Sequence, residues 1–312
     1  MKDESFTTLM RWLLETAPQG EPGTPADFRS WWSETAGVGR HWPLPFDGAV
    51  AAGFRAPGVG FAFGAGYEAG LRRLVPGLDA GAIVSLSVTE EGGGHPRAIA
   101  ARLEPRGGDR WALSGDKKWA TLSPLADLLL VAASEGDDLG GRKRIRLVRV
   151  ARGVPGVEVE AMPPTEFTPE ITHGVLRLRD VAIAAEQILP GDGFAEYVKP
   201  FRTIEDVHVA AGLLGYQLAV ATRYAWPHAA REELLDLIVN LRALALGDPS
   251  SPHVHVALAG FLSIQRRVLD ALEPHWSLAP EDVRQRWERD RRLTAIAGSA
   301  RARRREVAWE RI

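Results

Sequence analysis

The spacing of apolar residues changes twice along this chain of 312 residues, and that change constrains the fold more than any other feature. Up to about residue 75 the apolar positions recur at helical intervals. Residues 98–178 instead contain short apolar runs separated by turn signals, and residues 176–179 alternate between leucine and arginine. The helical spacing returns at residue 204. This order predicts an α+β chain in which a β domain lies between two helical regions.

The changes of spacing also set the expected domain boundaries. We predict an N-terminal helical domain over residues 1–82, a β domain over 83–198 and a C-terminal helical bundle over 199–312. Because no helix-length segments separate the predicted strands, the β domain is expected to be an antiparallel sandwich or barrel. The last four predicted helices should form an up-and-down bundle, and residues 18–25 a linker rich in proline. Helices are expected over residues 5–16, 27–36, 61–75, 204–224, 232–246, 254–272 and 281–309.

Composition and charge exclude several classes of protein and of site. The chain has no cysteine, so it has no disulfide, no thiolate metal site and no cysteine nucleophile. A formal net charge of −2 gives no electrostatic reason to expect nucleic acid or a membrane as a partner. The first residues contain Asp3 and Glu4, and no apolar run long enough for a signal peptide or membrane span follows them. We therefore expect a soluble cytoplasmic protein.

Two polar segments stand where the β region begins. Residues 88–94 read Val-Thr-Glu-Glu-Gly-Gly-Gly and follow an extended apolar segment. Residues 115–121 read Gly-Asp-Lys-Lys-Trp-Ala-Thr and are followed by Ala126-Asp127 and the apolar residues 128–131. We expect a ligand site here, since strand backbone, two threonine hydroxyls and an indole together offer hydrogen-bonding groups and an aromatic wall.

These segments, in this order and spacing, resemble the two flavin signatures of the acyl-CoA dehydrogenase family. The resemblance implies the family's fold and FAD as the cofactor. By resemblance, Leu86, Val88 and Thr89 would contact the polar edge of the isoalloxazine ring, Trp119 would flank the ring, and Thr121 would hydrogen-bond near its reactive nitrogen. The alternative is that Trp119 is a core tryptophan of a hairpin and the threonines are ordinary strand residues.

The turn after the first signature departs from the family. The family usually has Ser-Asp where this chain has His95-Pro96, and the family's serine approaches a phosphate. The backbone amides of the glycines, that of Gly94 included, can form an anion-binding nest. His95 is expected either to donate to a phosphate or to cap the turn.

Glu205 is the candidate catalytic base. Residues 209–215 read Val-Ala-Ala-Gly-Leu-Leu-Gly, and by resemblance to members with a base on the first bundle helix, Glu205 takes that position. Helical spacing puts Glu205 on one face with Val209 and Gly212, and we expect this small-residue face to admit a thin substrate. Asp206, which replaces the family's arginine, is expected to raise the pKa of Glu205 and suit it to removing an α proton from an acyl thioester. The alternative is a charged first helical turn.

The resemblance implies α,β-dehydrogenation of an acyl-CoA thioester by a homo-oligomer, and two other functions stay open. Counterparts of the segments that hold the adenine half of FAD, and of the family's C-terminal glutamate, are not found. A degenerate homologue acting as a scaffold, or a flavin-dependent monooxygenase, is therefore the alternative. The basic residues near the C-terminus are expected to face solvent or another subunit, or to receive phosphates. No metal site is expected, because His253-x-His255 lacks a third ligand.

Overall fold

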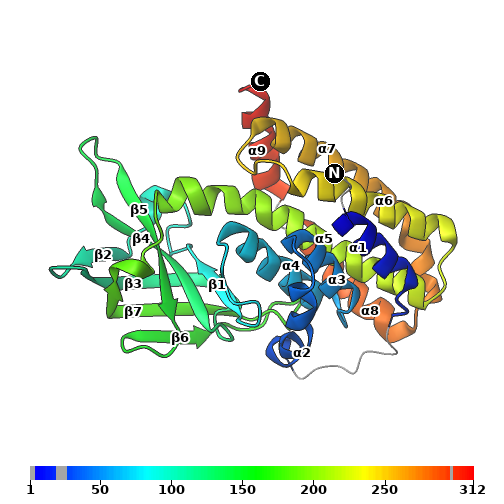
Figure 1. Ribbon diagram of the computed structural model, residues 1–312, viewed down its shortest axis with the longest axis horizontal. Helices are drawn as coiled ribbons and strands as arrows, with labels where there is room; N and C mark the ends of the chain where they lie inside the picture. The colour runs from blue at the N-terminus through cyan, green and yellow to red at the C-terminus, as the bar shows by residue number, and fades with distance from the viewer. Residues whose placement is uncertain (1–3, 19–26, 296–297) are drawn as a thin grey trace. The chain divides into compact units, whose positions relative to one another are not determined.

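The computed structural model describes residues 4–18, 27–295 and 298–312, and the chain divides into two compact units (Figure 1). The β unit comprises residues 82–165 and 171–202, and the helical unit comprises the rest. The helices before and after the β unit, which we assigned to separate domains, pack into one unit. Most of the predicted linker over residues 18–25 lies outside the described residues.

The β unit is built on one seven-stranded sheet in the order β1-β4-β2-β3-β7-β6, with β5 also paired to β4. Most pairs are antiparallel, as predicted. The prediction is wrong for two pairs, because β1 and β2 each run parallel to β4. A parallel pair needs a long connection, and the excursion of the chain through β2 and β3 supplies it between β1 and β4. The strands are β1 (Val84–Ser87), β2 (Arg102–Pro105), β3 (Arg110–Thr121), β4 (Leu128–Asp137), β5 (Lys143–Ala151), β6 (Val157–Ala161) and β7 (His173–Ala184).

Strand β4 is the centre of this sheet because it pairs with β1, β2 and β5. Its residues from Leu129 to Ser134 are buried whichever way they point. A strand covered on both faces needs apolar residues without alternation, which explains the continuous apolar run after Asp127. The Asp127 carboxylate also accepts a hydrogen bond from the Ile83 backbone N–H at 2.8 Å, which fastens the start of β1.

The helical unit contains one helix that the sequence did not reveal. α3 starts at Pro45, a residue suited to the first helical position, yet nearly all of its residues are buried. A helix buried on every side shows no amphipathic spacing, so it escaped a search for one. The described helices are α1 (Glu4–Glu15), α2 (Phe28–Arg40), α3 (Pro45–Phe54), α4 (Val59–Leu74), α5 (Lys199–Arg223), α6 (His228–Ala245), α7 (Pro252–Leu272), α8 (Glu281–Asp290) and α9 (Gly298–Trp309).

The last predicted helix is divided. Residues 281–309 form α8, a short 3₁₀ segment over Arg291–Ala295, and α9, while residues 296 and 297 lie outside the described part. α9 packs against α7, and α8 packs against α4 of the N-terminal helices.

Glycines let α5 approach α3 and α4 closely. A Cβ atom added at Gly53 of α3 would overlap the backbone of Gly212, and one at Gly66 of α4 would overlap the backbone of Val209. A Cβ at Gly215 would overlap a carbonyl of α3. Because only a residue without a side chain permits such contacts, the small residues of α5 are used for helix packing.

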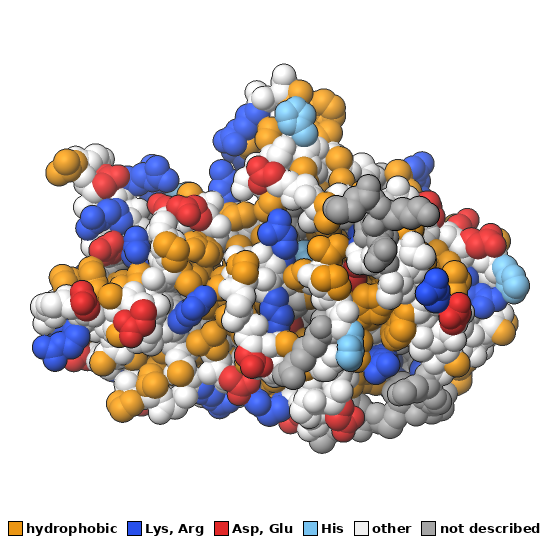
Figure 2. All heavy atoms as spheres, in the orientation of Figure 1, with side chains coloured by type: hydrophobic (Ala, Val, Ile, Leu, Met, Phe, Trp, Pro, Cys, Tyr) orange, Lys and Arg blue, Asp and Glu red, His pale blue; other side chains and the backbone are white. Residues whose placement is uncertain are grey.

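None of the helices in the described residues is both long and apolar enough to cross a bilayer. Basic and acidic side chains are interspersed over the face shown in Figure 2, in keeping with the net charge of −2.

Candidate functional site

The structure joins the two signature segments through the backbone. The Lys118 N–H donates to the Thr89 carbonyl oxygen at 2.8 Å, and the Lys117 ammonium donates to the Val88 carbonyl oxygen at 3.3 Å. The segment that follows β1 therefore runs beside the second half of β3. The structure thus brings together the two segments that the sequence named as one site.

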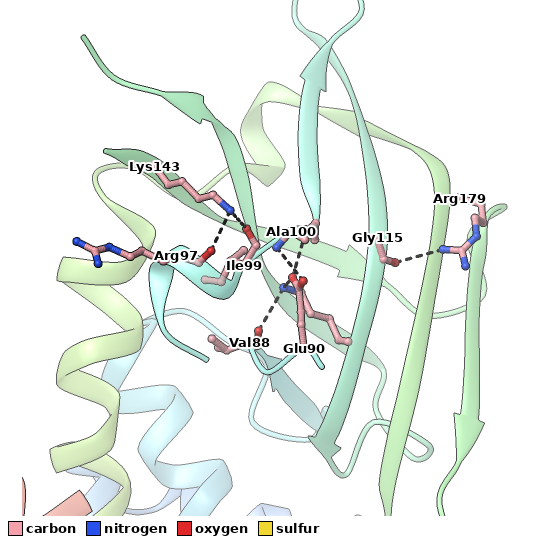
Figure 3. Close-up of polar contacts among 10 residues, drawn as sticks. Val88, Glu90, Arg97, Ile99, Ala100, Gly115, Lys143 and Arg179 are labelled. Atoms are coloured by element: carbon pink, nitrogen blue, oxygen red, sulfur yellow. Dashed lines mark hydrogen bonds and ion pairs between the residues drawn. The ribbon is translucent and has the colours of Figure 1, made fainter. Parts of the chain in front are cut away.

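A buried ion pair fastens this junction. The Lys117 side chain is 0% exposed, and its Nζ lies 2.6 Å from Glu90 Oε1. The Glu90 carboxylate also accepts hydrogen bonds from the backbone N–H groups of Ala100, at 2.7 Å, and Ala101, at 3.0 Å (Figure 3). Burial lowers the pKa of Lys117, and the Glu90 carboxylate offsets part of that shift.

Sequence reasoning gave neither Lys117 nor Glu90 a role. The available signal was the lysine of the second signature, with a glutamate directly after the threonine of the first signature. A buried ammonium group requires a counter-charge, so the two residues could have been paired on that ground.

Trp119 adopts a strained conformation at this junction. Its φ angle is 56°, in the left-handed region, and the pairing of β3 with β7 shifts register between Lys117 and Ala120. This β-bulge turns the indole outward, and Trp119 is 56% exposed. The alternative of a core tryptophan is therefore wrong.

The exposed indole meets His173 at the start of β7. The two rings lie in a T-shaped arrangement with centroids 5.9 Å apart and an interplanar angle of 69°. Burial lowers the pKa of His173, partly opposed by a hydrogen bond with the Ile171 backbone. His173 was not among the residues predicted from the sequence, because no spacing or motif pointed to it.

The other predicted residues of the β unit surround the same junction. Leu86 and Val88 are half-buried and alternate with the buried Ser85 and Ser87, so both face the same side of β1. Thr121 pairs with His173 in the register of β3 and β7. The side chains of Leu86, Val88, Thr121 and His173 are all partly exposed.

The glycine-rich turn follows directly. Gly94 lies against Thr89, since a Cβ atom at Gly94 would be 3.5 Å from the Thr89 hydroxyl oxygen. His95 is exposed, and its Nδ1 accepts a hydrogen bond at 3.3 Å from the Arg97 N–H, which caps the 3₁₀ segment Pro96–Ala98. The Lys143 ammonium holds the end of the turn through the carbonyls of Arg97 and Ile99 (Figure 3). Of the two expectations for His95, the structure agrees with the one in which His95 caps the turn.

Glu205 belongs to the helical unit, where it is half-buried in α5. Two expectations about its surroundings are wrong. The small-residue face at Val209 and Gly212 is filled by α3 and α4 and is not open to a substrate. Asp206 does not act as an uncompensated like charge, because Arg301 Nη2 lies 2.8 Å from its carboxylate and Arg304 contacts it as well.

The remaining candidates are engaged in packing. His255 Nε2 lies 2.8 Å from the Pro249 carbonyl oxygen and 3.2 Å from the Thr203 hydroxyl. No group of three or more metal-ligating side chains occurs in the part of the chain that the structure describes. Of the basic residues near the C-terminus, Arg289 pairs with Glu170, Arg291 with Glu273, and Arg301 and Arg304 with Asp206.

Comparisons with known proteins find relatives of part of the chain. Residues 85–181 match the family described as "Acyl-CoA dehydrogenase, middle domain". The probable acyl-CoA dehydrogenase FadE10 of Mycobacterium tuberculosis is 32% identical over 124 residues, which are 39% of this chain. The match spans only 19% of that relative's length.

Solved structures resemble the whole chain. Butyryl-CoA dehydrogenase from Megasphaera elsdenii superposes with a TM-score of 0.69 at 16% identity, over 99% of this chain and 98% of that one. A glutaryl-CoA dehydrogenase from Mycobacterium smegmatis in complex with FADH2 gives 0.59 at 18% identity, over 95% and 91%. This likeness confirms the predicted order of N-terminal helices, β domain and C-terminal helices.

Proposed function

We infer that this chain, which belongs to the acyl-CoA dehydrogenase family through its middle domain and its fold, is a flavoprotein that binds FAD on the β unit. Leu86, Val88, Thr89, Trp119 and Thr121 would hold the isoalloxazine ring. The observation that carries this proposal is the outward-turned indole of Trp119, directly beside the junction of the two signatures.

The residues present fit a planar aromatic group. An isoalloxazine ring needs an apolar or aromatic wall along its face and hydrogen-bonding groups at its edge. Trp119 offers an exposed indole, and Leu86 and Val88 offer half-buried apolar side chains. The glycine amides near Gly94 remain the proposed contact for a phosphate, because His95 Nδ1 is occupied by the turn itself.

The proposed reaction is the α,β-dehydrogenation of an acyl-CoA thioester. Glu205 would accept the α proton, and bound FAD would supply the acceptor for the hydride that leaves the β carbon. Glu205 is half-buried, which suits a carboxylate base. Because Asp206 pairs with two arginines, the negative charge next to Glu205 in the helix is compensated.

The test starts with the purified protein. We expect a yellow protein, or uptake of FAD on incubation, with the visible bands of oxidised flavin. Titration with butyryl-CoA without oxygen should bleach these bands. Glu205→Gln should slow bleaching by roughly 10²- to 10⁴-fold, the range for a lost general base. Glu233→Gln, an exposed glutamate of α6, is the matched control and should bleach at the wild-type rate.

A second function is favoured by one observation. The space beside the glycines of α5, which we expected to admit a substrate next to Glu205, is occupied by α3 and α4. A scaffold protein without catalytic activity does not need that space. A colourless protein that takes up no FAD would select the scaffold and end the oxidoreductase proposal. A wild-type bleaching rate in Glu205→Gln would instead remove only Glu205 from the mechanism. We also propose a homo-oligomer, to be measured by light scattering.

A further inference from the structure

The strained backbone of Trp119 is not compensated by burial of its side chain. A left-handed backbone is unfavourable for a residue with a large side chain, and the φ angle of Trp119 is 56°. The unit gains little burial in return, since the residue is 56% exposed. A strained and exposed residue held by its surroundings is typical of a ligand site.

Backbone pairing and one ring hold the indole in place. The backbone is set on one side by the hydrogen bond from Lys118 to Thr89 and on the other by the pairing of Ala120 with Gly174. Neither contact touches the indole ring. His173 does so, in the T-shaped contact at 5.9 Å.

The place of His173 in the chain makes it a firm support. The preceding buried residue Ile171 is 1% exposed, and the His173 carbonyl accepts a hydrogen bond from Met162 N–H at 2.8 Å. The His173 side chain is itself half-buried. A T-shaped contact with one fixed ring restricts the tilt of the indole and leaves much of the indole open to a second ring.

We propose that His173 is a positioning residue for the bound flavin, which acts through Trp119 by holding the indole at the angle that walls the flavin site. This inference rests on the proposed FAD site at Trp119. It assigns His173 no contact with the reacting atoms.

The test is a double-mutant cycle on FAD affinity, with Kd measured by flavin fluorescence. His173→Ala should raise Kd by roughly two- to twelvefold, the worth of one aromatic pair. In a Trp119→Ala background the same change should alter Kd by less than about twofold, because the residue through which His173 acts is gone. His173→Phe keeps a ring in the contact and should restore affinity. His253→Ala, an exposed histidine in α7, is the control.

A second readout needs no cofactor. In the apo-protein the Trp119 indole N–H gives one NMR cross-peak, identified by its loss in Trp119→Phe. That peak should shift in His173→Ala, whereas His253→Ala should leave it in place.

The outcomes separate the two proposals. FAD binding with an unchanged Kd in His173→Ala, or an equal loss in both backgrounds of the cycle, overturns the role of His173 and leaves the flavin site standing. A wild-type protein that binds no FAD overturns the flavin site and with it this inference. An unmoved indole peak in His173→Ala refutes the contact on which the inference depends.

Discussion

Replacing Glu90 by alanine is expected to destabilise the β unit strongly, because it leaves the ammonium group of Lys117 buried without a counter-charge. The Lys117 side chain is 0% exposed, and Glu90 lies 2.6 Å away. Breaking a buried ion pair by removing one partner costs about 3–5 kcal/mol. The N–H groups of Ala100 and Ala101 also lose their acceptor, so we expect the upper part of that range.

Glu91 offers a matched control on the neighbouring residue. Its carboxylate lies 3.2 Å from the Lys118 ammonium, but its side chain is 89% exposed, and an exposed pair is screened by water and salt. Glu91→Ala should therefore change the unfolding free energy by no more than about 0.5 kcal/mol. Both variants would be measured by urea unfolding, followed by circular dichroism.

A double variant tests the cause of the loss. Glu90→Gln with Lys117→Met removes both charges, while the amide oxygen still accepts from the backbone and methionine fills the volume of the lysine stem. It should be more stable than Glu90→Ala by at least 1–2 kcal/mol, on the order of the charge penalty. The reasoning fails if Glu90→Ala costs no more than Glu91→Ala, or if the double variant recovers nothing.

Three further predictions concern single residues. Burial lowers the pKa of His208 from 6.5 to about 4. Between these two pH values only the unfolded state takes up a proton, so the unfolding free energy decreases as the pH is lowered. At 1.36 kcal/mol per pKa unit, the loss of unfolding free energy between pH 7 and pH 4 is about 3 kcal/mol. We expect this loss to be absent in His208→Asn and unchanged in the exposed control His253→Asn when unfolding is measured at both pH values. Trp119→Gly should be more stable than Trp119→Ala by about 1 kcal/mol, because only alanine is strained at a φ of 56°; the opposite order would count against strain there. Gly212→Ala should lower the unfolding free energy by about 1–3 kcal/mol, since its Cβ would overlap α4. Gly260→Ala has open space at its Cβ and should not lower the unfolding free energy, so equal effects of the two variants would contradict the close packing of α5.

Much of the fold followed from local signals. The change from helical spacing to short alternating runs and back predicted the order of the regions, and the full-length likeness to butyryl-CoA dehydrogenase confirms that order. Local signals failed for α3, because a helix buried all round shows no periodicity, whereas the continuous apolar run of β4 was enough to predict a strand there. The parallel pairing of β1 with β4 joins segments far apart in sequence, which no local pattern encodes.

The candidate site shows the same division. The order of residue types over residues 85–121 was enough to name Thr89 and Trp119 together, because a motif carries its own spacing. The sequence was not enough to identify His173 as the partner of Trp119. His173 comes from another strand and contacts the indole only when β3 and β7 pair.

By itself, the sequence determined the succession of helical and β regions and the family that the junction of the two signatures resembles, because periodicity and motif spacing are local properties. Only the tertiary structure decided what surrounds those residues. It paired Lys117 with Glu90, turned the indole of Trp119 outward at a bulge, and filled the small-residue face of α5 with α3 and α4. These outcomes depend on which distant segments compete for the same buried space, and burial decides whether a charge, a ring or a glycine serves a ligand or the fold.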